Sequence, residues 1–114
     1  MHEASIAQSI IENLERRIVE GQIAGRVCCV YLMVGRLTAV VPDNLQFMFG
    51  VLARDSVLND ARLEIELVPV RARCETCRAE FEVEDMCFLC AACGSADVDI
   101  LSGRELLIES VEVE

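Results

Sequence analysis

The sequence predicts an α+β fold in which a small mixed sheet of about three strands packs with two helices, and a four-cysteine zinc-ribbon lobe is inserted before the last strand. Two segments carry apolar residues at helical spacing, and three others are rich in β-branched or alternating apolar residues. Residues 71–103 follow neither period and hold five of the seven cysteines. A chain of 114 residues suffices for one domain, or for one domain carrying a small lobe.

The first predicted helix covers residues 5–20, because apolar side chains recur there every four residues and charged side chains occupy the other faces. Its apolar stripe consists of Ile6, Ile10, Leu14 and Ile18. Ser5 and Gln8 are expected to form a capping box, and Gly21 suits the position after the helix end. Residues 1–4 are expected to be a short free end or the first turn.

The first predicted strand covers residues 27–34 and is closed by Gly35. Both of its faces are apolar, which is typical of a central strand. A second helix is expected to begin at Pro42 or Asp43 and to end at Arg54, because Pro fits the first helical turn and Asp43 can cap it. The stripe of this helix consists of Leu45, Met48, Phe49 and Leu52.

Two further strands are predicted from alternation. Residues 61–68 alternate apolar and charged side chains and form a half-buried strand that Pro69 ends. Residues 106–113 resume a strand pattern with a change of parity, which a bulge near Glu109 and Ser110 would explain. This last strand is expected to return to the sheet of the first two.

The inserted lobe contains two C-x-x-C pairs that lie 12 residues apart. The pairs are Cys74 with Cys77, and Cys90 with Cys93. This spacing predicts a structural zinc site with four cysteine ligands, because each pair directs two thiolates at one point and Zn²⁺ binds four of them tetrahedrally. Gly94 allows a sharp turn in which amides donate to sulfur, and alternating Phe81 and Val83 suit a short strand between the pairs. The predicted domains are residues 1–70, completed by residues 105–114, and a zinc-binding domain of residues 71–104.

The three other cysteines have alternative interpretations. Cys87 also forms a C-x-x-C with Cys90, but the pair that a glycine follows is preferred, which leaves Cys87 as a packed or spare thiol that could exchange with a ligand. Cys28 and Cys29 lie in an apolar strand and are expected to be small core residues. A dithiol redox enzyme would have one such motif opening a helix, whereas here two motifs flank a connector.

The charge and the termini exclude several classes of protein. The net charge is −10 and every cationic side chain is Arg, so a nucleic-acid partner is not expected. No apolar run of about 18 residues exists, which excludes a membrane span of that kind. An odd number of cysteines does not suit a secreted disulfide framework, and the N-terminus lacks a basic, apolar leader, so a cytoplasmic location is expected.

The only histidine of the chain is His2. A histidine near a terminus is most often a solvated side chain, but position two has special chemistry. The amino group of Met1, the backbone nitrogen of His2 and its imidazole can close fused chelate rings around one metal, and Glu3 could add a donor through its backbone or carboxylate. Three nitrogens in a plane suit Ni²⁺ or Cu²⁺ better than Zn²⁺. Because the imidazole binds only when neutral, affinity should weaken at acidic pH.

Three segments together resemble one known family. They are Met1-His2-Glu3 followed by Ser5, the C-x2-C-x12-C-x2-C lobe, and the ending Ser102-Gly103-Arg104-Glu105-Leu106 with Ile108-Glu109-Ser110. In this combination, over essentially the whole chain, the sequence resembles the HypA/HybF family of nickel metallochaperones, which serve hydrogenase maturation.

The resemblance implies a non-enzymatic nickel carrier. It implies nickel as cargo on Met1, His2 and Glu3, and structural zinc on Cys74, Cys77, Cys90 and Cys93. The implied partners are a nickel-handling maturation GTPase and the hydrogenase large subunit, and a homodimer is left open. Three residues depart from the family pattern. Ala91 replaces a proline in the second pair, and Val41 and Arg36 stand where acidic residues are common, so this loop is not expected to offer nickel a carboxylate.

Two other functions are less consistent with these residues than nickel transfer. The alternative is a zinc-ribbon module that binds nucleic acid or protein. Residues 71–104 hold four Arg and seven Asp or Glu, which makes a poor surface for nucleic acid, so binding to other proteins is the form of this alternative that remains. A hydrolytic zinc enzyme is rejected, since the sequence lacks the histidine and carboxylate ligands of an open zinc site.

Overall fold

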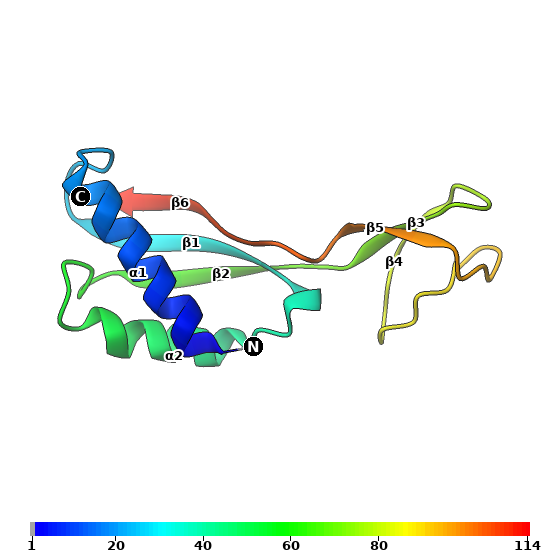
Figure 1. The fold of residues 1–114 in the computed structure, drawn as a ribbon, viewed down its shortest axis with the longest axis horizontal. Helices are drawn as coiled ribbons and strands as arrows, with labels where there is room; N and C mark the ends of the chain where they lie inside the picture. The colour runs from blue at the N-terminus through cyan, green and yellow to red at the C-terminus, as the bar shows by residue number, and fades with distance from the viewer. Residues whose placement is uncertain (1) are drawn as a thin grey trace. The chain divides into compact units, whose positions relative to one another are not determined.

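A computed structural model describes residues 2–114 of the chain (Figure 1). The elements are α1 (Glu3–Val19), β1 (Val27–Gly35), the short 3-10 helix η1 (Arg36–Thr38), α2 (Pro42–Ala53), β2 (Arg62–Val68), β3 (Arg71–Cys74), β4 (Glu80–Glu82), β5 (Val98–Ser102) and β6 (Leu106–Val113). They form two compact units. The described part of the first unit comprises residues 2–33, 40–66 and 107–114, and the second comprises residues 34–39 and 67–106. The α+β class predicted from the sequence is confirmed, whereas the boundaries and roles of the predicted domains stay predictions.

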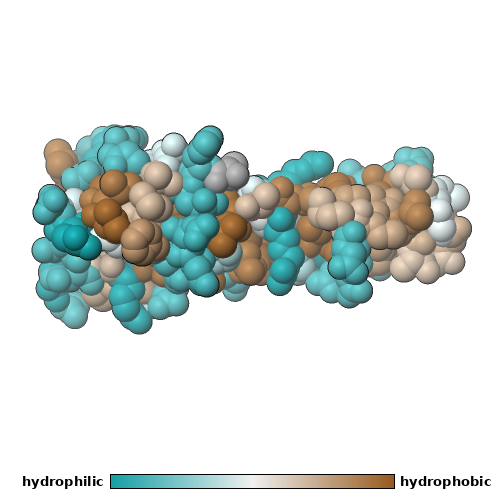
Figure 2. All heavy atoms as spheres, turned by 90° about the horizontal axis from the view of Figure 1, so that it is seen from below, coloured by the Kyte–Doolittle hydropathy of each residue, from teal (hydrophilic) through white to brown (hydrophobic). Residues whose placement is uncertain are grey.

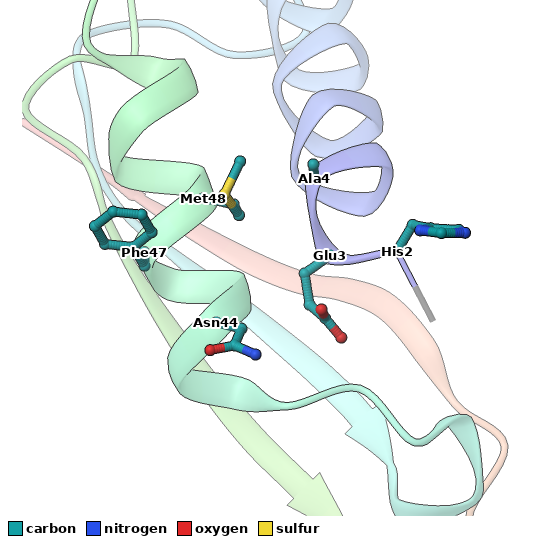
Figure 3. Close-up of a pocket in the computed structure, with 6 residues that line it drawn as sticks. All are labelled: His2, Glu3, Ala4, Asn44, Phe47 and Met48. Carbon is teal, nitrogen blue, oxygen red and sulfur yellow. The ribbon is translucent and has the colours of Figure 1, made fainter.

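The first unit contains a three-stranded sheet with the order β2-β1-β6, so β1 is the central strand, as its two apolar faces predict. Backbone hydrogen bonds join Arg26 and Glu114 in both directions, which makes β6 antiparallel to β1. Strands β1 and β2 run in the same direction, so the sheet is mixed (Figures 1 and 3). Helices α1 and α2 pack on each other and bury Leu14, Leu45 and Phe49.

Helix α1 begins two residues earlier than the sequence predicts, so the predicted capping box is wrong. His2 is the N-cap residue, and its carbonyl accepts the first helical hydrogen bond from the N–H of Ile6 at 3.2 Å. Ser5 therefore lies inside the helix, where it cannot cap. The predicted end is confirmed. Gly21 has φ +78°, and the N–H groups of Gly21 and Gln22 bond to the carbonyls of Ile18 and Arg17 at 3.1 and 2.9 Å, which is a Schellman motif.

Helix α2 has the predicted proline at its start but a different cap. Val41 is the N-cap residue, and Asp43 lies inside the first turn and makes no capping hydrogen bond, so the predicted cap is wrong. An apolar N-cap offers no acceptor of its own. The helix ends at Ala53, with Arg54 as the C-cap residue. Leu45 and Phe49 of the predicted stripe are buried, and Met48 and Leu52 are half-buried.

The burial pattern of the sheet changes parity partway along two strands. In β1, the most buried positions change from odd-numbered to even-numbered residues between Cys29 and Val30, which are both fully buried. In β6, the half-buried Ile108 and Val111 lie three residues apart. The bulge expected near Ser110 would account for this change and stays a prediction.

The second unit contains a second three-stranded sheet with the order β4-β3-β5. The sequence predicts only the short strand at Phe81. Strand β3 escapes prediction because Arg71-Ala72-Arg73-Cys74 lacks β-branched and aromatic residues. Ala72 is fully buried and pairs with Phe81 on one side and Ile100 on the other. The core of this unit consists of Val70, Ala72 and Val83, packed by Leu37, Phe81, Phe88, Val98 and Ile100.

All seven cysteines are free of disulfides. Across residues 2–114, no helix is both long and apolar enough to cross a membrane.

Candidate metal centres

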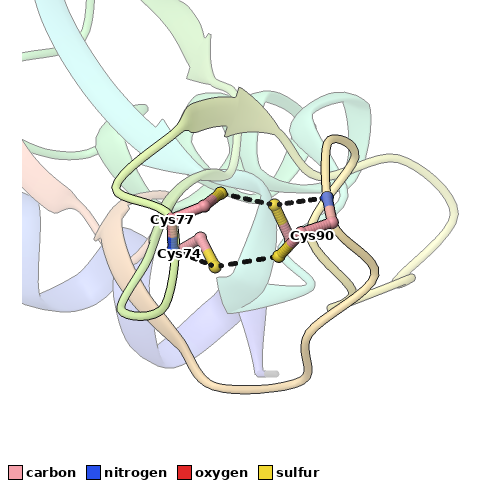
Figure 4. Close-up of side chains that lie close together, drawn as sticks. Cys74, Cys77 and Cys90 are labelled. Atoms are coloured by element: carbon pink, nitrogen blue, oxygen red, sulfur yellow. Dashed lines mark hydrogen bonds between the residues drawn. The ribbon is translucent and has the colours of Figure 1, made fainter.

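The sulfur atoms of the four cysteines in the two C-x-x-C pairs converge on one point in the second unit (Figure 4). All four lie within 4.8 Å of one another. The Sγ–Sγ distance is 3.6 Å between Cys74 and Cys93 and also between Cys77 and Cys90. A tetrahedral zinc ion with Zn–S bonds of about 2.3 Å needs sulfurs about 3.8 Å apart. The cluster is therefore a four-cysteine metal site whose dimensions and donors fit Zn²⁺.

The two pairs are built in the same way. In the first pair, Cys74 Sγ accepts hydrogen bonds from the N–H groups of Thr76 and Cys77 at 3.3 and 3.4 Å. In the second, Cys90 Sγ accepts bonds from Ala92 and Cys93 at the same two distances. In each pair the first cysteine is buried and the second is exposed. Such N–H donors stabilise a thiolate and fix its direction toward a metal.

The residue after each pair turns the chain through the left-handed region. Arg78 has φ +68° and its N–H bonds to the carbonyl of Cys74 at 2.9 Å. Gly94 has φ +76° and its N–H bonds to the carbonyl of Cys90 at 2.9 Å. Glycine adopts this conformation without a steric penalty, whereas arginine does not. The sequence singles out the glycine and not the arginine, although both positions need the same turn.

The thiols of the site differ in acidity. The N–H of Cys77 is the strongest of the donors that lower the pKa of Cys74 to about 6, against the opposing effect of burial. For Cys93, the N–H of Ser95 lowers the pKa, but the sulfur contact with Cys74, burial and the contact with Cys90 outweigh it and raise the pKa to about 12. Without metal, the four thiols therefore hold protons unequally, and metal binding must displace those that remain.

The other three cysteines lie outside this cluster. Cys87 is exposed and is not among the residues whose sulfurs converge. Cys29 is fully buried in the core, as its apolar strand predicts. Cys28 is half-buried, and its thiol donates to the carbonyl oxygen of Glu112 at 3.3 Å.

Two of the predicted nickel residues, His2 and Glu3, lie at the start of α1 in the first unit (Figure 3). Met1 lies outside the described residues. His2 is exposed, has extended backbone angles (φ −85°, ψ 97°), and its side chain makes no capping hydrogen bond. Glu3 is half-buried, and its Oε2 accepts a hydrogen bond from the N–H of Val41 at 3.3 Å. The carboxylate thus reaches the start of the other helix.

An open hollow of about 360 Å³ lies beside these residues. It is lined by His2, Glu3, Ala4, Asn44, Phe47 and Met48. Phe47 is 69% exposed and lies off the buried stripe of α2. An aromatic residue outside the stripe is the signal by which the sequence could have identified Phe47 as a surface residue of this site. Figure 2 shows hydrophobic surface interspersed with hydrophilic side chains on the face that it presents. A small ion can therefore reach the start of α1 directly from solvent.

Comparisons with known proteins agree on one family. A family model described as "Hydrogenase/urease nickel incorporation, metallochaperone, hypA" matches residues 1–113. A hydrogenase maturation factor HypA from Desulfatibacillum aliphaticivorans is 43% identical over 99% of this chain and 87% of that protein. One from Geotalea uraniireducens is 45% identical over 100% of both chains. The solution structure of the Ni metallochaperone HypA from Helicobacter pylori has a TM-score of 0.68 at 28% identity, and the match covers 99% of this chain and 97% of that one.

Proposed function

The chain belongs to the HypA family of nickel-incorporating metallochaperones, which are maturation factors and not enzymes, and from this premise we propose that it carries Ni²⁺ on its first three residues. In this proposal the donors are the amino group of Met1, the backbone nitrogen and imidazole of His2, and the backbone of Glu3. The carrier delivers the ion for maturation of nickel–iron hydrogenase.

The observation that carries the proposal is the position of His2, the only histidine of the chain. Its imidazole is exposed and is one residue away from the terminal amine, so one imidazole nitrogen and the amine nitrogen can bind the same ion. The open hollow beside it leaves a path by which a receiving protein can approach and take the ion. A carrier needs this accessibility, because a fully enclosed ion exchanges slowly.

The four-cysteine site has the opposite character and supports a structural role for Zn²⁺. Cys74 and Cys90 are buried, with exposures of 0% and 4%, and Cys77 and Cys93 are exposed. The contrast with the terminal site lies in the number of protein donors. Four sulfur donors at tetrahedral distances leave no open position for cargo. Zinc therefore stabilises the second unit, and nickel is carried by the first.

The proposal includes partners of two kinds. A nickel-handling GTPase acts in the same maturation step, and the hydrogenase large subunit receives the ion. Both are expected in the cytoplasm, where thiols stay reduced and the four-cysteine site can hold its metal.

A nickel titration of the untagged, zinc-loaded chain tests the proposal. His2→Ala is expected to abolish stoichiometric Ni²⁺ binding, because it removes the imidazole donor, and to leave the zinc content and the circular dichroism of the protein unchanged. Gln8→Ala, which removes an exposed side chain from the same helix, is the control and should bind nickel like the unmodified chain. Undiminished nickel affinity in His2→Ala would exclude the terminal site. Absence of nickel binding by the unmodified chain would favour the alternative, a zinc-ribbon module without nickel transfer.

A further inference from the structure

We propose that the side chain of Glu3 positions the nickel-binding residues by anchoring the start of α1 to the start of α2, and that its carboxylate is not itself a nickel ligand. The inference rests on the proposed function for its link to nickel. The anchor itself is a property of the metal-free fold.

The first step is the hydrogen bond that Glu3 makes. Its Oε2 lies 3.3 Å from the backbone nitrogen of Val41, the N-cap residue of α2. In a capping box, a glutamate three residues into a helix reaches back to the N–H of the N-cap residue. Here the residue at that position of α2 is Asn44, and the carboxylate comes instead from the neighbouring helix. Glu3 therefore replaces a local cap.

The second step is that α2 lacks a side-chain cap of its own. Val41 carries no polar side chain, and neither it nor Asp43 makes a capping bond. Pro42 at the first helical position has no N–H to offer. The carboxylate of Glu3 is thus the side-chain acceptor that the fold supplies at the start of α2.

The third step concerns charge. Glu3 lies in the first turn of its own helix and reaches the N-terminus of α2. Both helix ends carry partial positive charge from unpaired N–H groups, so one carboxylate stabilises two helix dipoles. In Figure 3 the carboxylate of Glu3 and the imidazole of His2 extend in different directions, so the carboxylate serves the helix ends in this arrangement.

The fourth step connects the anchor to the cargo. The carbonyl of His2 is held by the N–H of Ile6 at 3.2 Å, which leaves the backbone nitrogen and imidazole of His2 for a metal. The first turn of a helix frays unless it is held. By holding Glu3, the anchor fixes the backbone of His2, and this lowers the conformational entropy that is lost when nickel binds.

Two substitutions at Glu3 separate anchoring from ligation. Glu3→Gln keeps an oxygen that can accept the Val41 N–H, whereas Glu3→Ala removes it. We expect Glu3→Ala to weaken nickel binding about tenfold and Glu3→Gln to weaken it by less than about threefold, as for the loss of one cap. The visible absorption and circular dichroism of bound Ni²⁺ should be the same in both variants and the unmodified chain. Glu12→Ala, at an exposed position of α1, is the control and should change none of these quantities.

Hydrogen exchange of the Val41 amide in the nickel-free protein provides an independent measurement. Protection should fall in Glu3→Ala and persist in Glu3→Gln. Unchanged protection in Glu3→Ala would overturn the anchor. A changed nickel spectrum in Glu3→Gln, or a loss of affinity equal to that of Glu3→Ala, would show instead that the carboxylate is a ligand. If the unmodified chain binds no nickel, the proposed function fails, while the exchange measurement still decides whether Glu3 anchors the two helices.

Discussion

The turn after each C-x-x-C pair offers a paired test of how the four-cysteine site is built. Gly94 and Arg78 occupy equivalent positions in the left-handed region, with φ values of +76° and +68°. An added methyl group at Gly94 would meet nothing within 4 Å, so Gly94→Ala changes only the cost of the backbone conformation. Arg78→Gly makes the reverse change in the other turn.

The magnitudes follow from the left-handed backbone. A residue with a Cβ costs about 1–2 kcal/mol more than glycine in this region. Gly94→Ala should therefore destabilise the zinc-bound second unit by about 1 kcal/mol and weaken zinc binding about fivefold. Arg78→Gly should be neutral or stabilise by up to about 1 kcal/mol, because glycine loses more entropy on folding and so offsets part of the relief. The ion pair of Arg78 with Glu75 at 3.8 Å is exposed and contributes little.

Zinc affinity measured by competition with a chromophoric chelator is the assay. Gly50→Ala is the matched control, because this glycine lies inside α2, a methyl group there also meets nothing within 4 Å, and its φ is not positive. The same substitution at Gly50 should leave zinc affinity unchanged and stabilise the protein by about 1 kcal/mol. Equal zinc affinity in Gly94→Ala and the unmodified chain, or weaker affinity in Arg78→Gly, would refute the assignment of backbone cost to these turns.

Two more predictions follow from the second unit. Gly35→Ala should destabilise the protein by at least about 3 kcal/mol and lower its thermal unfolding midpoint strongly, because the new Cβ would overlap the carbonyl group of Gly103. A midpoint within error of the unmodified protein would show that this backbone contact is not as close as described. In the reduced, metal-free protein, a thiolate should appear in the ultraviolet absorbance with a midpoint near pH 6, since the pKa of Cys74 is lowered to about 6 by the N–H of Cys77. Cys74→Ser should reduce the amplitude of the acidic transition without removing it, because the pKa of Cys90 is also lowered, by the N–H of Cys93. An unchanged amplitude in Cys74→Ser would assign the acidic thiol elsewhere. Folding lowers the pKa of the Cys74 thiol, so the ionised thiol stabilises the folded protein more than the protonated thiol does. The contribution of Cys74 to the stability of the metal-free fold is fully present above its unfolded pKa of 9.0 and is lost as the pH falls through the folded pKa of about 6.

Periodicity predicted the elements of the first unit but not how its helices begin. Apolar spacing depends on burial, which is the same whether α1 begins at Glu3 or Ser5. The start is decided by which carbonyl accepts the first helical bond, and here it is that of His2. Likewise, the acceptor at the start of α2 is Glu3, a residue 38 positions away, and no local pattern indicates such a contact.

The two metal centres were predictable to different degrees for a physical reason. Four thiolates around one ion require two short, regular turns, so Cys74, Cys77, Cys90 and Cys93 leave a fixed spacing in the sequence, and the structure brings their sulfurs together. A terminal chelate needs only the amine, one amide and one imidazole, and it leaves almost no pattern. The hollow beside it depends on residues of α2, such as Asn44 and Phe47, that approach Glu3 only after folding.

The central claim is that nickel binds at the terminal amine and His2. Equilibrium dialysis of the untagged, zinc-loaded chain against Ni²⁺, with and without acetylation of the Met1 amine, tests it most directly. Acetylation removes one nitrogen donor and changes no side chain. The account predicts stoichiometric nickel on the free-amine chain and loss of that nickel on the acetylated chain, with zinc content equal in both. Equal nickel binding by the two forms would contradict it.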